Sequence, residues 1–281
     1  MRKRIIYSLL LLLLVFLGLS CDKAKYQSRT AIIFAFKEEG ELLRKNIELE
    51  DSLFFCGRTF WMGKLQEKEL VVVSSGIGMT NSAMTTQLLI DKFKPKQIIF
   101  TGICGGINPE NHIGDIIIPD KWATHDFGYY DKNGFKIMPV PVTMPGKRES
   151  DTVTYFEVDS NLLEKAQSVK NEAKKRFRSI LGRLPQIKVG GNGVSGNSFI
   201  DQVEKRLWLK EKFNAQIVDM ESAGSVQVAN INNVPILIVR SCSDLAGGSG
   251  SSTAEAELEE FMKVVADNSA EFVLELLKEL N

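Results

Sequence analysis

The chain has 281 residues, 44% of them apolar, and its 35 basic residues balance its 35 acidic ones. This length suits one large globular domain, and the lack of a basic excess argues against a nucleic-acid-binding protein. No repeat with a period of about 20–50 residues stands out, which argues against a solenoid.

The first twenty residues predict an export signal. Arg2-Lys3-Arg4 is basic and Ile5–Leu19 is apolar, and the apolar run is too short for a comfortable membrane span. Cys21 follows as in a bacterial lipobox, so we expect a lipidated Cys21 on an exported, membrane-anchored protein. A secreted protein without the lipid and an uncleaved anchor are the alternatives. The predicted boundaries are 1–20 for the signal peptide, 21–29 for a polar tether and 30–281 for the folded domain.

The first half of the folded domain alternates apolar runs with helical stretches. Helices are expected over Glu41–Ile47 and Met79–Phe93. The expected strands are Thr30–Phe36, Leu53–Leu65, Glu69–Ser74, Gln97–Thr101 (which ends in the glycine-rich Gly102–Gly106) and Ile116–Ile118.

The second half begins with Lys121–Asp151, which is rich in aromatic residues and proline and is expected to form long loops with an edge strand. The expected helices are Ser160–Phe177, Ser222–Asn230 and the amphipathic Thr253–Leu280, and the expected strands are Gln186–Gly190, Ile217-Val218 and Ile236–Val239. This alternation predicts an α/β fold: a single three-layer α/β/α domain around a mixed, largely parallel sheet.

Cysteine and histidine patterns do not predict a metal site. Cys56, Cys104 and Cys242 have no CxxC spacing, and they fit neither a disulfide framework nor a zinc site. His112 and His125 form no HExxH motif. We therefore expect no metal.

A glycine-rich motif follows the predicted strand Gln186–Gly190. Residues Gly191–Gly196 fit GxGxxG after a strand, and Asp219 lies about twenty residues further on, as in a dinucleotide-binding fingerprint. The motif comes late in the chain, and no clear helix of sufficient length follows it. We therefore interpret Gly191–Phe199 as a ligand-contacting loop of another kind.

Three carboxylates follow predicted strands. Glu39, Glu221 and Asp244 each come at or after the carboxyl end of a strand, where open α/β sheets bind ligands. Any one of them alone is more commonly a solvated or helix-capping charge. Three at one face of a sheet instead suggest acid and base groups for the oxocarbenium-like transition state of glycosidic cleavage.

With these residues in place, the chain resembles the 5′-methylthioadenosine/S-adenosylhomocysteine nucleosidases of the purine nucleoside phosphorylase superfamily. The resemblance runs from about Thr30 to the C-terminus. It rests on the order and spacing of AFKEE (35–39), SGIGMTNSA (75–83), TGICGG (101–106), GDIIIPD (114–120), VSGNSFI (194–200), VDMES (218–222) and NVPILIVRSCSD (233–244).

The resemblance implies hydrolysis of the N-glycosidic bond of methylthioadenosine and S-adenosylhomocysteine, and of 5′-deoxyadenosine as a further candidate, with release of adenine. It makes Asp244 the general acid at adenine N7 and Glu39 the group that activates water. Glu221 would accept hydrogen bonds from the ribose hydroxyls. Such an acid must be protonated at neutral pH, so the pKa of Asp244 has to be raised by its surroundings.

The resemblance also implies a set of substrate-binding residues and no cofactor. Phe36 would line the 5′ pocket, Phe199 would stack on adenine beside Ile200, and Met220 would pack under the sugar. Gly105, Ser243 and Arg240 would lie around the reacting groups. Phe127 and Tyr129, in the loop 125–130, would complete the pocket of the second subunit of a homodimer.

Some positions depart from the family pattern. Ile103-Cys104 stand where Ser-Ala is usual, Asn197 replaces an Asp, Asp219 replaces a Glu and Phe36 replaces a Met. None of these changes removes the three carboxylates, so we expect activity, with the choice of 5′ substituent open.

Several alternatives remain at this point. A phosphate-dependent phosphorylase of the same superfamily would need a cation near the nucleophile, and Lys37 is the candidate. Other nucleoside N-glycosidases of the superfamily stay open. A surface lipoprotein that acts as an adhesin or binding protein is suggested by the signal peptide alone.

Overall fold

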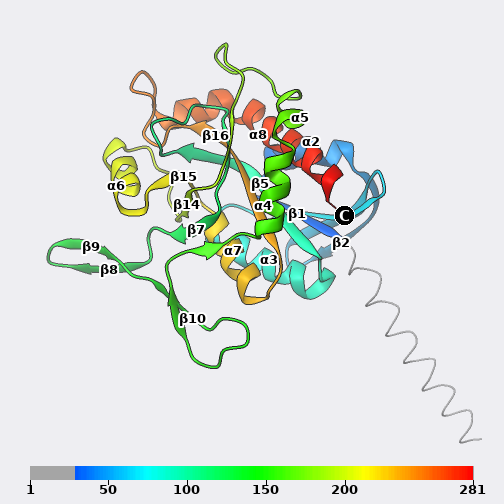
Figure 1. Ribbon diagram of the computed structural model, residues 1–281, viewed down its shortest axis with the longest axis horizontal. Coiled ribbons are helices and arrows are strands. Elements are labelled where there is room, and N and C mark those ends of the chain that lie inside the picture. The colour runs from blue at the N-terminus through cyan, green and yellow to red at the C-terminus, as the bar shows by residue number, and fades with distance from the viewer. Residues whose placement is uncertain (1–28, 281) are drawn as a thin grey trace, which may run out of the picture.

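A mixed β-sheet of twelve strands forms the centre of the computed structural model, which describes residues 29–280 (Figure 1). Most of its strands run in the order β12-β7-β14-β15-β5-β1-β4-β3-β2, while β16 pairs with β5 and β6, and β6 also pairs with β13. Its strands are β1 (Thr30–Phe34), β2 (Glu48–Phe55), β3 (Arg58–Leu65), β4 (Lys68–Ser74), β5 (Gln97–Gly106), β6 (Ile116–Ile118), β7 (Lys121–Thr124), β12 (Phe156–Glu157), β13 (Ile187–Val189), β14 (Asn192–Ser195), β15 (Ala215–Asp219) and β16 (Ile236–Asp244).

Helices cover both faces of this sheet. The helices are α2 (Lys37–Asn46), α3 (Met79–Phe93), α4 (Ser160–Ser168), α5 (Lys170–Lys174), α6 (Val203–Phe213), α7 (Ser222–Ile231) and α8 (Ala254–Glu279). In Figure 1, α2 and α8 lie together on one side of the sheet and α3 and α7 on the other. The central strands β1 and β16 are therefore buried along their whole length, and in β16 this includes the polar Arg240 and Asp244. The predicted single α/β/α domain with a mixed sheet is confirmed.

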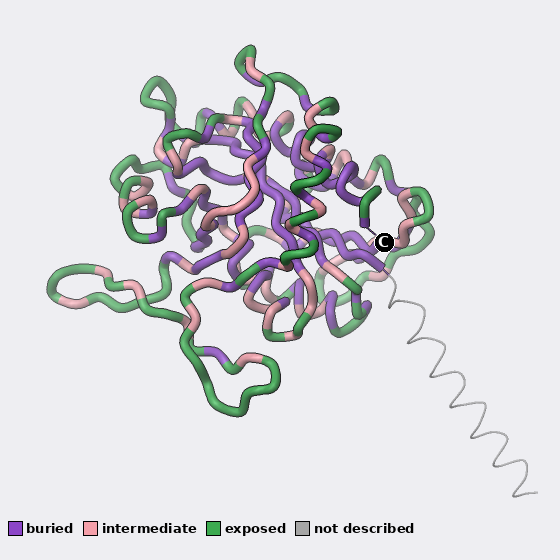
Figure 2. The backbone as a smooth tube through the Cα atoms, viewed as in Figure 1, coloured by how far each residue is buried: buried purple, intermediate pink, exposed green. Residues whose placement is uncertain are grey.

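Two small hairpins project from the body. They consist of β8 (Gly128–Asp131) with β9 (Gly134–Ile137), and of β10 (Val140–Val142) with β11 (Asp151–Val153). Figure 2 shows both as mainly exposed chain outside the buried centre. The interpretation of Lys121–Asp151 as loops with an edge strand was wrong in part, because β7 lies inside the sheet between β12 and β14.

Several predicted boundaries were also wrong. Leu53–Leu65 is two strands, because Cys56 and Gly57 both take positive φ (48° and 71°) and form the tight turn that joins antiparallel neighbours. Helix α2 begins at Lys37, not at Glu41, so Glu38 and Glu39 lie in its first turn.

The helix predicted over Ser160–Phe177 is broken at Val169 into α4 and α5. The glycine-rich segment Gly191–Phe199 contains β14, an internal strand, and the next helix, α6, starts only at Val203. A dinucleotide-binding turn would need a helix directly after the motif, so Gly191–Gly196 is not such a turn.

The segments 1–28 and 281 lie outside the described residues, and with them the predicted signal peptide and Cys21. Within residues 29–280, no helix combines the length and the apolar content that crossing a bilayer demands.

Candidate active site

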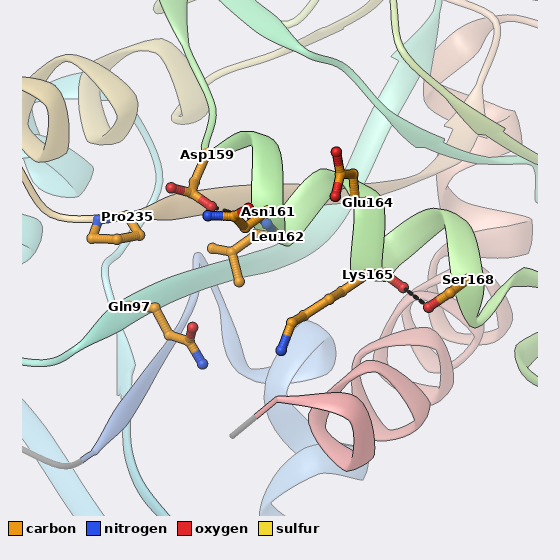
Figure 3. Close-up of a pocket in the computed structure, with 8 residues that line it drawn as sticks. All are labelled: Gln97, Asp159, Asn161, Leu162, Glu164, Lys165, Ser168 and Pro235. Carbon is orange, nitrogen blue, oxygen red and sulfur yellow. Dashed lines mark hydrogen bonds between the residues drawn. The ribbon is translucent and has the colours of Figure 1, made fainter.

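A cavity of about 710 Å³ lies where β1, β5, β15 and β16 end. Nine of the predicted site residues line it: Phe36, Glu39, Gly105, Phe199, Ile200, Met220, Glu221, Ser243 and Asp244. A second cavity of about 510 Å³ lies at the opposite ends of β5 and β16, beside α4, and is lined by residues such as Gln97, Asp159 and Pro235 (Figure 3). Open α/β sheets bind ligands at the carboxyl ends of their strands, so the first cavity is the candidate site.

Both parallel and antiparallel strand pairs bring these residues together. β1 and β16 both run parallel to β5, which brings the segments after Phe34 and Asp244 to one end of the sheet. β15 runs antiparallel to the last residues of β5, with Val218 opposite Gly105. The strand before Glu221 therefore meets the cavity from a different direction from the other two.

Asp244 is a buried acid at the end of β16. Its Oδ1 accepts a hydrogen bond from the Ala246 N–H (2.8 Å), and Ser243 Oγ donates to its Oδ2 (2.8 Å). Burial raises the pKa of Asp244 to about 7, although these two hydrogen bonds oppose the change. A Cβ on Gly105 would lie 2.9 Å from Asp244 Oδ1, so glycine leaves room for the carboxyl group. An appreciable fraction of this acid is therefore protonated at neutral pH.

Glu39 lies in the first turn of α2 with its carboxylate buried. Its Oε2 accepts a hydrogen bond from the Ala35 N–H (2.6 Å) and its Oε1 accepts one from the Ile103 N–H (2.9 Å). Burial raises the pKa of Glu39, and the positive charge of Arg240 opposes this. The carboxylate is thus fixed by β1 and β5 and is a stronger base than an exposed glutamate.

Arg240 is fully buried behind the cavity wall and does not line the cavity. Its Nε donates to Asp219 Oδ2 (2.7 Å), and its Nη2 donates to Ser222 Oγ (2.9 Å) and lies 3.9 Å from Glu221 Oε2. Its guanidinium carbon lies 4.3 Å from the centroid of the Phe100 ring. Arg240 is therefore held rigidly by an ion pair and a ring.

One nitrogen of Arg240 remains unused. Among residues 29–280, its Nη1 has no hydrogen-bond partner although it is buried. A Cβ on Gly102 would lie 2.3 Å from this nitrogen and 2.4 Å from Glu39 Oε1. The absent side chain of Gly102 thus allows a guanidinium donor and a carboxylate base to approach the same point.

Glu221 precedes α7, and its Oε1 accepts a hydrogen bond from the Gly78 N–H (2.8 Å). Its carbonyl oxygen accepts one from Ser82 Oγ (2.8 Å). Burial and then the charge of Asp219 raise the pKa of Glu221 to about 7, against the opposing effect of Arg240. The carboxyl group is therefore tied to the loop that leads into α3.

Phe199 and Ile200 form another part of the wall. The Phe199 side chain is 45% exposed and Ile200 is buried. The preceding Asn197 accepts a hydrogen bond from the Met79 N–H (3.0 Å), and its own N–H donates to Asp126 Oδ2 (3.0 Å). Asn197 therefore connects this segment to the start of α3.

Helix α8 contributes a wall that the sequence did not reveal. Glu255, Leu258 and Met262 line the cavity from its first turns, and Ile77 lines it from the loop before α3. In the sequence, Leu258 looks like one member of an apolar stripe. The spacing of Glu255, Leu258 and Met262 places them on one face of the helix. The sequence does not say that this face lines a cavity.

Phe127 and Tyr129 are not part of this wall. They lie beside and within the projecting β8–β9 hairpin and are 39% and 49% exposed. Their predicted role depends on a second subunit and stays a prediction.

With the site described, the chain can be compared with known proteins. The family model described as "Phosphorylase superfamily" matches residues 29–278. The chain belongs to this superfamily. Among curated relatives, the 5′-methylthioadenosine/S-adenosylhomocysteine nucleosidase of Staphylococcus haemolyticus is 34% identical over 250 residues, which cover 89% of this chain and 99% of the relative. The enzyme of the same name from Listeria monocytogenes is 33% identical and covers 88% and 97%.

Solved structures of superfamily members agree with the fold. A nucleosidase of the same name from Neisseria meningitidis, in complex with methylthio-immucillin-A, is 29% identical, with a TM-score of 0.74 and coverage of 90% of this chain and 100% of the other. A futalosine hydrolase from Helicobacter pylori is 25% identical, with a TM-score of 0.74 and coverage of 90% and 99%. The resemblance stated from the sequence motifs is therefore confirmed.

Proposed function

We propose that this superfamily member is a nucleosidase that hydrolyses the N-glycosidic bond of 5′-methylthioadenosine and S-adenosylhomocysteine and releases adenine. The observation that carries the proposal is the pair of buried carboxyl groups, Asp244 at the end of β16 and Glu39 in the first turn of α2, which line one cavity. One is suited to give a proton and the other to take one. The curated relatives of this name support the substrates.

Asp244 acts as the general acid. Its pKa of about 7 keeps much of it protonated at neutral pH, and proton transfer to adenine N7 makes the base a neutral leaving group. Phe199 stacks on the base and Ile200 contacts its edge, which orients N7 towards the acid.

Glu39 acts on the attacking water. Its carboxylate lines the cavity and accepts a proton from the water, while Arg240, buried behind the wall, acts on Glu39 through its positive charge. Ile103 offers this water no side-chain hydrogen bond, so Glu39 holds it together with the substrate. Glu221 accepts hydrogen bonds from the ribose hydroxyls, with Met220 beneath the sugar.

Water is favoured over phosphate as the nucleophile. Phosphate would need cationic ligands, and no Lys or Arg is found among the described residues that line the cavity. Lys37, the candidate cation of the alternative function, is exposed and does not line it.

The complete site is proposed to form in a homodimer. Phe127 and Tyr129 would then leave the surface and close the partner subunit's cavity. The adhesin alternative rests on the signal peptide alone, and no feature of the described surface adds to it.

Export and lipidation are proposed from the sequence of the first 21 residues. Metabolic labelling with an alkynyl fatty acid should mark the wild-type protein and not the Cys21→Ser variant. Equal labelling of both would contradict lipidation at this residue.

The function is tested by adenine release from methylthioadenosine by the purified full chain without phosphate. Asp244→Asn should lower kcat by about 10²–10⁴-fold, the usual contribution of a general acid, while Glu260→Gln, an exposed change on α8, should leave it intact. Dependence on phosphate would favour the phosphorylase. Absence of release from a folded wild-type protein would contradict the proposal.

A further inference from the structure

The cavity is also lined by two carboxylates that the proposed chemistry does not use. Glu255 lies in the first turn of α8 and is exposed, and Glu38 lies in the first turn of α2 and is half-buried. Both line the same cavity as Asp244. They reach it from two helices that pack together, since Lys263 of α8 lies 3.9 Å from Glu41 of α2.

These two differ from the other acids of the wall. Asp219 is paired with Arg240, and Glu39, Glu221 and Asp244 each accept hydrogen bonds from backbone N–H groups. Within residues 29–280, the carboxylates of Glu38 and Glu255 accept no hydrogen bond and belong to no ion pair. These two carboxylates are therefore available to interact with a ligand in the cavity.

The wall beside them is apolar. Leu258 follows Glu255 by three residues and Met262 follows Leu258 by four, so the three side chains share one face of α8. Phe36 faces the cavity two residues before Glu38. A substituent in this region therefore meets these apolar side chains together with the exposed carboxylate of Glu255.

The nearby lysine does not neutralise this region. Lys263 follows Met262 directly, but it forms ion pairs with Asp267 and Glu41. The described lining residues include six carboxylates and neither Lys nor Arg. An anionic group that contacts these lining residues would meet carboxylates and no cationic side chain among them.

We propose that Glu255, assisted by Glu38, selects nucleosides whose 5′ substituent has an apolar stem and a cationic end over those with an anionic end. The inference rests on the proposed function, which places the base at Asp244 and the ribose at Glu221 and so leaves this wall for the 5′ substituent. The favoured 5′ substituents end in ammonium-type cations, and those whose only charged group is a phosphate or a carboxylate are disfavoured.

Three adenosine derivatives of matched size test the inference. They carry 3-aminopropylthio, butylthio or 2-carboxyethylthio at the 5′ carbon, so their ends are cationic, neutral and anionic. With the full-length protein at low salt, kcat/KM should fall in that order, by about two- to fivefold per step, as expected for partly exposed charges. The differences should shrink in 0.5 M NaCl, because salt screens exposed charges.

Variants of α8 identify the residue. Glu255→Gln should reduce the preference and Glu255→Lys should reverse it, each expressed as kcat/KM relative to that of the neutral compound with the same variant. Glu260→Lys makes the same charge change at an exposed position of α8 that does not line the cavity, and it should keep the wild-type order.

The results separate this inference from the proposed function. If the neutral compound is hydrolysed but all three give equal kcat/KM, or if Glu255→Lys behaves like Glu260→Lys, the charge selection is overturned and the nucleosidase function stands. If no compound is hydrolysed, the proposed function fails, and the dissociation constants of the three compounds then decide. Equal constants, or no binding, overturn the charge selection as well.

Discussion

Asp244 and Glu221 show at the scale of single residues how this site trades stability for chemistry. Burial raises the pKa of each carboxyl group to about 7, far above the ordinary values of 3.8 and 4.5. Between the ordinary pKa and about pH 7, each of these two groups binds more protons in the folded protein than in the unfolded chain. Their contribution to the free energy of unfolding therefore falls as pH rises, and it levels off above pH 7. The carboxyl group proposed as the general acid therefore destabilises the fold at neutral pH.

Removing the charge should reverse this effect. Asp244→Asn cannot ionise, so we expect it to raise the free energy of unfolding by roughly 2–4 kcal/mol at pH 8 and by nothing near pH 3. Urea unfolding at pH 3, 5 and 8 measures the difference, with Glu260→Gln as the exposed control. A variant no more stable than the wild type at pH 8 would show that Asp244 is not forced into a buried, charged state.

Gly102 is a second residue whose identity follows from the site. Its φ lies outside the left-handed region, so alanine is excluded by contact and not by backbone strain. Gly102→Ala would press on Arg240 and Glu39, and we expect a loss of about 1–3 kcal/mol in stability together with a lower kcat. Gly106→Ala, in the same strand, meets the end of the Leu245 side chain at 3.1 Å and should do less. Equal effects of the two changes on kcat would contradict the steric argument.

At the scale of elements, the first turns of α8 hold the loop that follows Asp244. Glu257 is buried, its Oε2 accepts from the Leu245 N–H (3.0 Å) and its Oε1 accepts from the Ser249 N–H (2.8 Å). The N-terminus of the same helix is fixed by Asp201, whose Oδ1 accepts from the Ala254 N–H (2.8 Å). Helix α8 thus links the wall of the cavity to the position of the acid.

Glu257→Gln tests this link. The amide would turn an NH₂ group towards one of the two backbone donors, so one of them loses its acceptor. We expect a loss of about 1–3 kcal/mol in stability and a lower kcat with little change in KM. Thermal unfolding and steady-state kinetics measure both, with Glu260→Gln as the control on the same helix. A change in stability without a change in kcat would show that the loop held by Glu257 does not position Asp244 for the reaction.

At the scale of the whole molecule, the projecting β8–β9 hairpin is where a second subunit is proposed to dock. Tyr129 is 49% exposed and Tyr130 82% exposed on this hairpin. Changing both to serine should convert the dimer into a monomer and lower kcat/KM, as measured by light scattering and adenine release. Phe54→Ser removes an aromatic side chain that is 74% exposed on β2, outside the hairpin, and serves as the control. A wild-type protein that is already monomeric and active would contradict the shared site.

The sequence predicted the elements whose signals are local. The long amphipathic helix at the C-terminus and α3 were found within about a residue of their bounds, because their apolar periods extend over several turns. The turn at Cys56-Gly57 was missed, because cysteine rarely occupies a position of positive φ and gives no turn signal. Nine of the predicted site residues line the cavity. They were found because the order and spacing of the motifs identified the family, which composition alone does not do.

The sequence by itself determined that strands and helices alternate around a mixed sheet, and it predicted nine of the residues that line the cavity. Only the tertiary structure decided how these residues meet. β15 approaches the cavity antiparallel to the end of β5. Arg240 lies behind the wall with one nitrogen that has no partner within residues 29–280, and α8 lines the cavity with Glu255. The reason is physical: periodicity and caps depend on neighbours along the chain. Burial, raised pKa values and the face that a helix presents to a cavity depend on contacts between segments far apart in it.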